Sequence, residues 1–290
     1  MVIGETMSGS LKTELVIPSY NRIDILLNTL RSVRILYPDL KVCIGLQGHK
    51  PTEQEDEALM MFRHLRLEMF DEPCTTRTLN HCIQSSDADI VLILDDDAIP
   101  HFGWLEAHMH AFTQDLQLAY TSGRIIEFSK GRSAFSEYTR IHAEWLFGIF
   151  LGAEKKINGR IIGWINKLGL ILSNYDRPGI CMINSPREGN MGIRREIFLT
   201  MGGFNTNFKG NAWGFGAEYG LRLARTRRFG RYIGDAIVIH YEVTTGGSRQ
   251  ATKIQWFKDY MHNNKVLISS LGSQSWLGAL PRLIKKRFFN

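Results

Sequence analysis

The sequence is poor in cysteine, and its cysteines are not arranged for a metal centre or a disulfide framework. Only four of the 290 residues are cysteine, and no two of them form a C-x-x-C pair. This spacing indicates neither a structural zinc site nor a small disulfide-stapled fold. The cysteine usage fits a reducing compartment.

The sequence also lacks any apolar run long enough to span a bilayer. Residues 1–15 do not combine a basic start with an apolar stretch, so they do not have the pattern of a signal peptide. We therefore expect a cytoplasmic protein without a membrane-spanning helix.

Outside the C-terminal region the chain has almost no net positive charge. The formal net charge is +6, yet the residues from Arg249 onward hold eight basic side chains and one acid, Asp259. The rest of the chain is therefore close to neutral. This distribution argues against a nucleic-acid partner and indicates a local patch for an anionic partner.

Strand and helix patterns alternate along the first hundred residues. Short apolar runs predict strands at 14–18, 42–46, 65–70 and 90–94, and helical spacing predicts helices at 23–36, 53–64 and around 79–84. Beyond residue 97 we expect helices at 104–113 and 217–225 and strands at 118–126, 188–194 and 236–240. The alternation predicts an α/β fold with a mostly parallel central sheet and helices on both faces.

Three adjacent acids, Asp95, Asp96 and Asp97, follow the most apolar predicted strand directly. Open α/β sheets bind ligands at the carboxyl ends of their strands. Carboxylate oxygens suit Mn²⁺ or Mg²⁺, which can bridge the oxygens of a diphosphate. A solvated acidic turn with a helix cap is the alternative.

Several segments resemble the family 2 glycosyltransferases, which have the GT-A fold. The opening segment ELVIPSYNR at 14–22 resembles their first strand and loop, and 90–100 resembles their Asp-x-Asp segment. The segment EGNMGIRR at 188–195, with GGFN at 202–205, is similar to their acceptor-side strand and loop. Residues 213–222 resemble the region of their catalytic acid. The resemblance implies a nucleotide-binding half at 13–100 and an acceptor half at 101–250, followed by a helical basic extension at 251–290.

The resemblance implies a set of donor-binding residues in the first half of the chain. These are Pro18, Tyr20, Asn21, Arg22, Gln47, Arg77, Asn80, Asp95 and Asp96. Gln47 stands near the place where the family usually has an acid that contacts the base. An ordinary turn is the alternative for Tyr20 and Asn21, and a solvated helix arginine is the alternative for Arg77.

The resemblance also implies a metal site and a catalytic acid. Asp97 would be the main metal ligand and His240 would complete the site, with Mn²⁺ or Mg²⁺ as the ion. Glu218 would take the proton of the attacking hydroxyl. An i,i+4 ion pair between Glu218 and Arg222 is the alternative.

The remaining implied site residues lie in the second half. Asn190, Trp213 and Gly214 would lie on the acceptor side, and Arg249 could close over the diphosphate as part of a lid. A plain flexible loop is the alternative for the segment of Arg249.

The basic and aromatic tail at 276–289 fits an anionic membrane surface, with a helix packed on the domain as the alternative. We therefore expect a cytoplasmic enzyme, peripheral on the inner face of the membrane.

The expected reaction is transfer of a single sugar, with inversion, from a nucleotide-diphosphate sugar of UDP type. The acceptor would be a saccharide or a lipid-linked molecule, as in bacterial surface-polysaccharide synthesis. A catalytically weak or dead sugar-nucleotide-binding relative and a nucleotidyltransferase on a similar fold are the alternatives.

Overall fold

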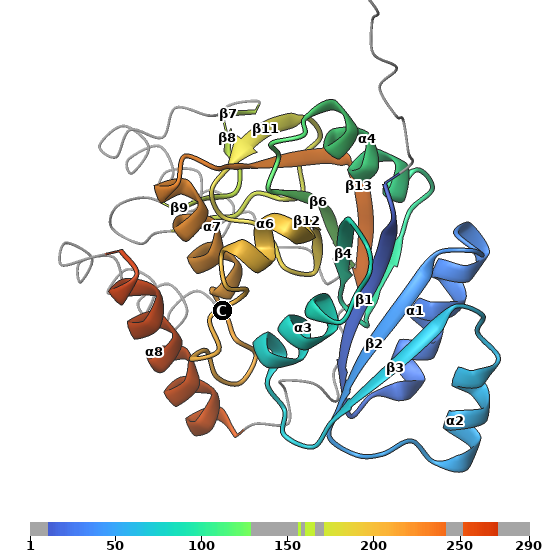
Figure 1. Cartoon of the computed structure of the whole chain (residues 1–290). Coiled ribbons are helices and arrows are strands. Elements are labelled where there is room, and N and C mark those ends of the chain that lie inside the picture. The colour runs from blue at the N-terminus through green and yellow to red at the C-terminus, as the bar shows by residue number, and fades with distance from the viewer. Residues whose placement is uncertain (1–10, 129–155, 158–159, 166–170, 242–251, 272–290) are drawn as a thin grey trace, which may run out of the picture.

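The computed structural model describes residues 11–128, 156–157, 160–165, 171–241 and 252–271 (Figure 1). Its centre is a nine-stranded sheet in the order β11-β13-β6-β12-β4-β1-β2-β3, with β5 paired to β13. The strands of this sheet are β1 (Thr13–Tyr20), β2 (Lys41–Gln47), β3 (Leu65–Phe70), β4 (Ile90–Leu94), β5 (Ala98–Pro100), β6 (Tyr120–Phe128), β11 (Ile180–Ile183), β12 (Asn190–Arg194) and β13 (Gly230–Tyr241). Two small sheets pair β7 (Lys156–Ile157) with β8 (Arg160–Ile161) and β9 (Trp164–Ile165) with β10 (Ile171–Leu172).

Most strands of the central sheet run in one direction. Strands β1, β2, β3 and β4 pair in parallel, and so do β6 and β13. Strand β12 lies antiparallel between β4 and β6, so it joins the two parallel groups without changing their common direction. The mostly parallel sheet expected from the sequence is confirmed.

Helices cover both faces of this sheet. They are α1 (Ile23–Leu36), α2 (Glu53–Met60), α3 (Thr75–Gln84), α4 (Trp104–Gln114), α6 (Arg195–Thr200), α7 (Phe215–Arg225) and α8 (Lys253–Ser269). Alternate residues of β4 point to opposite faces, because side chains alternate along a strand. Leu92 and Leu94 join the core beneath α1 and α4, whereas Val91 and Ile93 join the core beneath α3, α6 and α7. Burial of β4 on both faces explains its uninterrupted apolar sequence.

Helix α1 begins and ends at the residues expected from its apolar spacing, but α2 is shorter than expected. A capping box between Thr52 and Glu55 fixes the start of α2. The helix ends at Met60 instead of residue 64, and His64 takes a positive φ of 55° before β3 begins. The left-handed backbone at His64 is incompatible with a continued helix.

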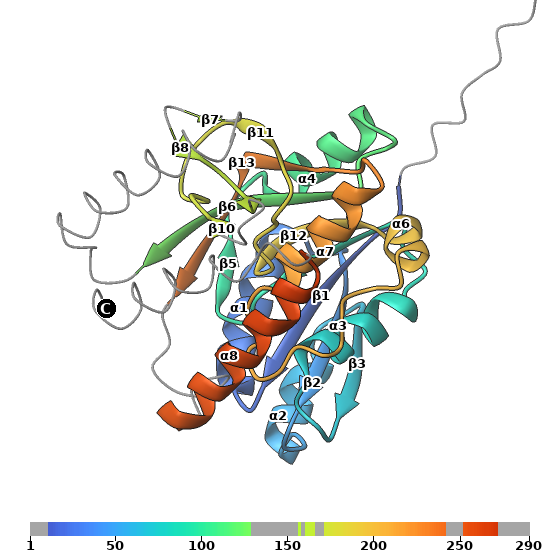
Figure 2. The same ribbon diagram turned by 90° about the vertical axis from the view of Figure 1, so that its left-hand side faces the viewer.

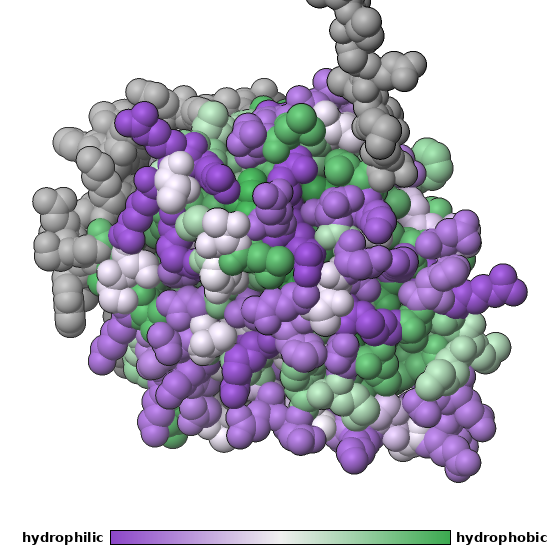
Figure 3. Space-filling model, in the orientation of Figure 1, coloured by the Kyte–Doolittle hydropathy of each residue, from purple (hydrophilic) through white to green (hydrophobic). Residues whose placement is uncertain are grey.

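Helix α8 belongs to the folded body. It packs beside α7 (Figures 1 and 2), and its Leu267 is fully buried in the core that also holds α7. The tail expected to bind membranes at 276–289 lies outside the described residues. Among the described helices, none is long and apolar enough to cross a bilayer. The face of the molecule in Figure 3 is mostly hydrophilic, with apolar residues in small, separate patches.

Candidate active site

A cleft of about 770 Å³ opens at the carboxyl ends of β1, β4 and β13. The sheet contributes Pro18 and Tyr20 from β1, the acids that follow β4, and His240 from β13. The opposite wall comes from the segment before α7 and from α8. Because the parallel strands end at one edge, residues far apart in the sequence meet there.

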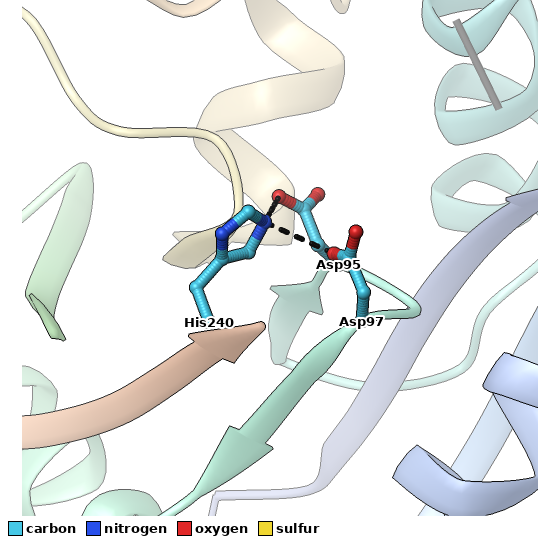
Figure 4. A group of neighbouring side chains, drawn as sticks. All are labelled: Asp95, Asp97 and His240. Atoms are coloured by element: carbon cyan, nitrogen blue, oxygen red, sulfur yellow. Dashed lines mark ion pairs between the residues drawn. The ribbon is translucent and has the colours of Figure 1, made fainter. Parts of the chain in front are cut away.

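Asp95, Asp97 and His240 form a compact group in this cleft (Figure 4). One potential ligand atom from each lies within 4.8 Å of the other two. His240 Nε2 is 3.0 Å from Asp97 Oδ1 and 3.8 Å from Asp95 Oδ2. Pairing of His240 with Ala98 in the β13–β5 ladder brings the histidine next to the acids.

The donor set of this group fits a divalent cation. Asp97 Oδ1 is buried and has no partner with hydrogen-bond geometry, although His240 Nε2 is close in distance. Two groups that lie close together without hydrogen-bond alignment are what two ligands of one metal ion would show. Two carboxylates and an imidazole are a suitable set for Mn²⁺.

The ionisation of the group follows from burial and mutual contact. The pKa of Asp95 is raised by desolvation inside the cleft, although 39% of its side chain is exposed there, and the charge of Asp97 adds to that effect. Burial opposes ionisation of Asp97 as well, but contact with His240 and the charge of Arg22 outweigh it and lower the pKa of Asp97. Contact with Asp97 raises the pKa of His240. The contact between His240 and Asp97 thus favours the charged form of each group.

Asp96 points away from its neighbours and anchors the first loop. It is 1% exposed and accepts hydrogen bonds from Ser19 Oγ at 2.6 Å and from Arg22 Nε at 2.9 Å, and it also contacts Arg22 Nη2. Arg22 Nη1 reaches Asp97 Oδ2 at 3.1 Å. Arg22 and Asp96 line the cleft, yet their main contacts are with each other.

Three of the other residues expected to hold the donor line the cleft. They are Pro18, Tyr20 and Gln47. Gln47 is buried, and its Oε1 accepts a hydrogen bond from Cys74 N at 2.7 Å, which fixes its amide. Asn21 lies outside the cleft lining. Its φ is 53°, and its Oδ1 accepts from His49 N at 2.8 Å, so it shapes the turn instead.

Arg77 and Asn80 do not line the cleft. Arg77 pairs with Glu72 at 3.1 Å and borders a separate pocket of about 360 Å³. Asn80 bonds with both ends of its amide to the backbone of Phe204, at 2.8 Å each. The expectation that these two residues bind the donor has no support from their positions.

The acceptor-side residues separate into two groups. Trp213 and Gly214 line the cleft, as expected. Asn190 is the first residue of β12 and is fully buried; its Oδ1 accepts from Trp104 Nε1 at 2.8 Å and lies 3.0 Å from His108 Nε2. Its position does not support a role in the acceptor site, because its amide is bonded within the core.

Glu218 is buried on α7 and does not line the cleft. Its side chain is 3% exposed, and both of its oxygens accept from Arg222 Nε, at 2.9 and 3.1 Å. Arg222 in turn donates to the carbonyls of Met201 and Gly203. This is the i,i+4 pair that the sequence offered as the alternative, in a buried form. The geometry does not support Glu218 as the base.

The cleft contains residues that the sequence analysis left without a role. They include Glu188, directly before β12, and Trp256 and Asp259 from α8. Glu188 opens the segment that resembled the acceptor strand, so its neighbourhood carried a signal. Nothing in the sequence placed α8 beside the cleft. Arg249, expected on a lid, lies outside the described residues.

Comparisons with known proteins agree with this architecture. A crystal structure of GalNAc-T7 with UDP, GalNAc and Mn²⁺ superposes with a TM-score of 0.65 at 14% sequence identity. The match covers 89% of this chain and 48% of that chain, so the present chain spans about half of the length of that protein. No curated protein sequence matches. The family model described as glycosyl transferase family 2 matches residues 14–167, which is more than half of the chain. The chain therefore belongs to glycosyl transferase family 2, with the GT-A fold.

Proposed function

We propose that this glycosyltransferase moves one sugar from a nucleotide-diphosphate sugar to an acceptor hydroxyl, with inversion and with the help of a divalent metal. The observation that carries the proposal is the meeting of Asp95, Asp97 and His240 in the same cleft as the β1 loop. A metal ligand set beside a preformed loop is what a nucleotide diphosphate requires.

The roles of the residues follow from their places. Asp97 and His240 would hold Mn²⁺ or Mg²⁺, and Asp95 would hold the ribose side of the donor. When bound, the ion stabilises the negative charge that develops on the leaving diphosphate. Tyr20 and the fixed amide of Gln47 would hold the nucleoside. Arg22, restrained by Asp96, keeps the loop against the acids.

We propose the donor and the acceptor as chemical classes and not as single compounds. A UDP-type donor is supported by the similar fold of GalNAc-T7, which was crystallised with UDP, and by the Gln47 amide in the cleft, which can pair with a base edge. The acceptor would be a saccharide or a lipid-linked molecule that enters along Trp213 and Gly214, as in bacterial surface-polysaccharide or glycoconjugate synthesis. Transfer of a single sugar remains our proposal.

The place of action is proposed from charge alone. The basic residues of the tail would hold the enzyme at the inner face of the cell membrane, with the catalytic body in the cytoplasm. No nucleic-acid partner is proposed.

A second candidate, a sugar-nucleotide-binding relative with little or no turnover, is favoured by the position of Glu218. The acid expected as the base is bonded to Arg222 and lies outside the cleft. Such a protein would bind the donor without releasing the nucleotide.

The test is nucleotide release from a panel of nucleotide sugars, measured with Mn²⁺ and with a chelator. We expect release from at least one donor with Mn²⁺ and its loss with the chelator. NMR of the product should show the inverted anomer, because one displacement gives one inversion. Tight binding without release would favour the second candidate, and a retained anomer would refute the single displacement.

A further inference from the structure

The cleft holds two carboxylates besides the acids that follow β4, and one of them stands beside the metal ligands. These two, within the described part of the chain, are Glu188 and Asp259. Asp259 lies on α8, which packs on α7. Its Oδ1 accepts a hydrogen bond from Gln255 Nε2 at 2.8 Å. Glu188 directly precedes the strand that pairs with β4.

The β12–β4 pairing fixes Glu188 next to the metal group. Asn190 pairs with Leu94, so the next residue outward on each strand, Gly189 and Asp95, also lie side by side. Asp95 N lies 3.4 Å from Gly189 O, and a Cβ on residue 189 would fall 2.1 Å from Asp95 Oδ2. Glycine at position 189 therefore leaves room for the Asp95 side chain, and Glu188 directly precedes this contact in the sequence.

The first turn of α7 fixes the Glu188 side chain. Gly216 N donates to Glu188 Oε1 at 2.8 Å, and a Cβ on residue 216 would fall 2.7 Å from that oxygen. The amino end of a helix favours a carboxylate. Among the other described residues only Gly216 donates to this carboxylate, and the backbone N–H of Glu188 itself is also directed at it. Because Glu188 lines the cleft, its second oxygen is left for a ligand there.

Glu188 thus lies between the metal ligands and the wall formed by Trp213 and Gly214. The donor sugar and the acceptor hydroxyl must meet in this interval. Glu218, by comparison, has both oxygens paired and lies outside the cleft.

We propose that Glu188 is the general base of the transfer, an inference that rests on the function proposed above. The acceptor oxygen forms a bond to the anomeric carbon of the donor sugar. The bond from that carbon to the diphosphate oxygen breaks, and its electron pair leaves with the nucleoside diphosphate. The hydroxyl proton moves to the open oxygen of Glu188.

The environment of Glu188 agrees with this role. Burial raises the pKa of Glu188, and the charge of Asp95 contributes in the same direction. A carboxylate with a raised pKa is a better proton acceptor near neutral pH than an ordinary exposed one.

The test compares carboxylate variants in metal-dependent nucleotide release, with Mn²⁺, water as the acceptor, and UDP-glucose, UDP-galactose, UDP-GlcNAc and UDP-GalNAc as donors. Glu188→Gln keeps an oxygen for Gly216 N but removes the basicity. We expect its turnover to fall by ~10²–10⁴-fold, with unchanged affinity for UDP and Mn²⁺ by calorimetry and an unchanged melting temperature. Glu188→Asp, which withdraws the carboxylate by one methylene, should also be slow. Glu196→Gln, in the exposed first turn of α6, is the control and should match the wild type.

The outcomes separate this inference from the function beneath it. A wild-type rate in Glu188→Gln, or a larger loss in Asp259→Asn or Glu218→Gln, would overturn Glu188 as the base while leaving the transferase intact. Unfolding of both Glu188 variants would show that Glu188 only caps α7, and this result would also overturn its role as the base. A wild-type protein that releases no nucleotide from any donor would refute the proposed function, and the base assignment with it.

Discussion

At the residue scale, three neighbouring acids serve two purposes. Asp95 and Asp97 converge on His240, whereas Asp96 turns into the protein and bonds to Ser19 and Arg22. The three acids lie in the turn between β4 and β5, which Ala98 N closes by donating to Asp95 O at 3.2 Å, and this turn directs Asp96 away from the other two. Repulsion among the three is reduced, because Arg22 contacts both Asp96 and Asp97.

This division predicts that substitutions at two adjacent positions affect different properties, stability at Asp96 and nucleotide binding at Asp95. Asp96→Ala leaves Arg22 without its main partner and should lower the free energy of unfolding by about 3 kcal/mol, as for other buried ion pairs. Asp95→Ala should leave stability nearly unchanged, because its side chain is 39% exposed, and should weaken Mn²⁺-dependent nucleotide binding. Urea unfolding and calorimetry measure the two effects. Equal stability losses in the two variants would contradict the division.

The sequence predicted that Asp97 and His240 lie together, but it did not predict the position of Glu218. Asp97 lies in the turn after β4 and His240 is the next-to-last residue of β13, and parallel strands bring their carboxyl ends to one edge. The place of Glu218 depends instead on which side of α7 faces the cleft. That is decided by the carbonyls of Met201 and Gly203, which bind Arg222 and turn the pair inward. No local pattern encodes such a contact.

At the element scale, one buried polar group joins α4 to β6 and β12. His108 of α4 is fully buried, 2.7 Å from Thr121 Oγ1 and 3.0 Å from Asn190 Oδ1. Asn190 also donates to the carbonyls of Arg124 and Ala236. Its amide therefore ties four elements together, which explains why this asparagine lies in the core instead of the cleft.

Burial lowers the pKa of His108 from 6.5 to about 4, which predicts a pH dependence of stability. Between these two values the unfolded chain binds a proton that the folded chain excludes. Stability from this group is therefore complete above pH 6.5 and is lost as the pH falls toward 4, by about 3 kcal/mol in total.

Urea unfolding at a series of pH values between 4 and 7 measures this loss. His108→Gln should flatten the dependence, and His110→Gln, exposed on the same helix, should leave it unchanged. The same slope in His108→Gln and the wild type would show that another group is responsible.

The elements differ in how far their sequences predict them. Helix α1 and strand β4 have the expected bounds, because apolar spacing and burial agree along them, and β3 has them although it is only partly buried. Helix α2 ends at Met60, four residues short of the expected end, and the chain then turns through His64, which has a positive φ, into β3. Helix α8 forms part of the cleft wall through long-range packing on α7, which has no local signature.

At the scale of the whole molecule, the folded body and the basic tail should act separately. Truncation after Ser275 keeps α8, whose Leu267 is buried in the core, so the body should remain folded and release nucleotide normally. The truncated form should lose binding to vesicles that contain anionic lipid, because the tail carries the excess positive charge. Vesicle sedimentation of both forms measures this. Equal binding would show that the tail does not attach the enzyme to membranes.

We expect the cleft to hold a nucleotide diphosphate through a metal ion bound by Asp97 and His240. Anomalous diffraction at the manganese edge, from crystals grown with UDP and Mn²⁺, would show whether the ion binds there. We predict one anomalous peak in direct contact with Asp97 Oδ1 and His240 Nε2, adjoining the diphosphate oxygens, with the uracil near Tyr20 and Gln47. A manganese peak elsewhere, or UDP bound outside this cleft, would contradict the account.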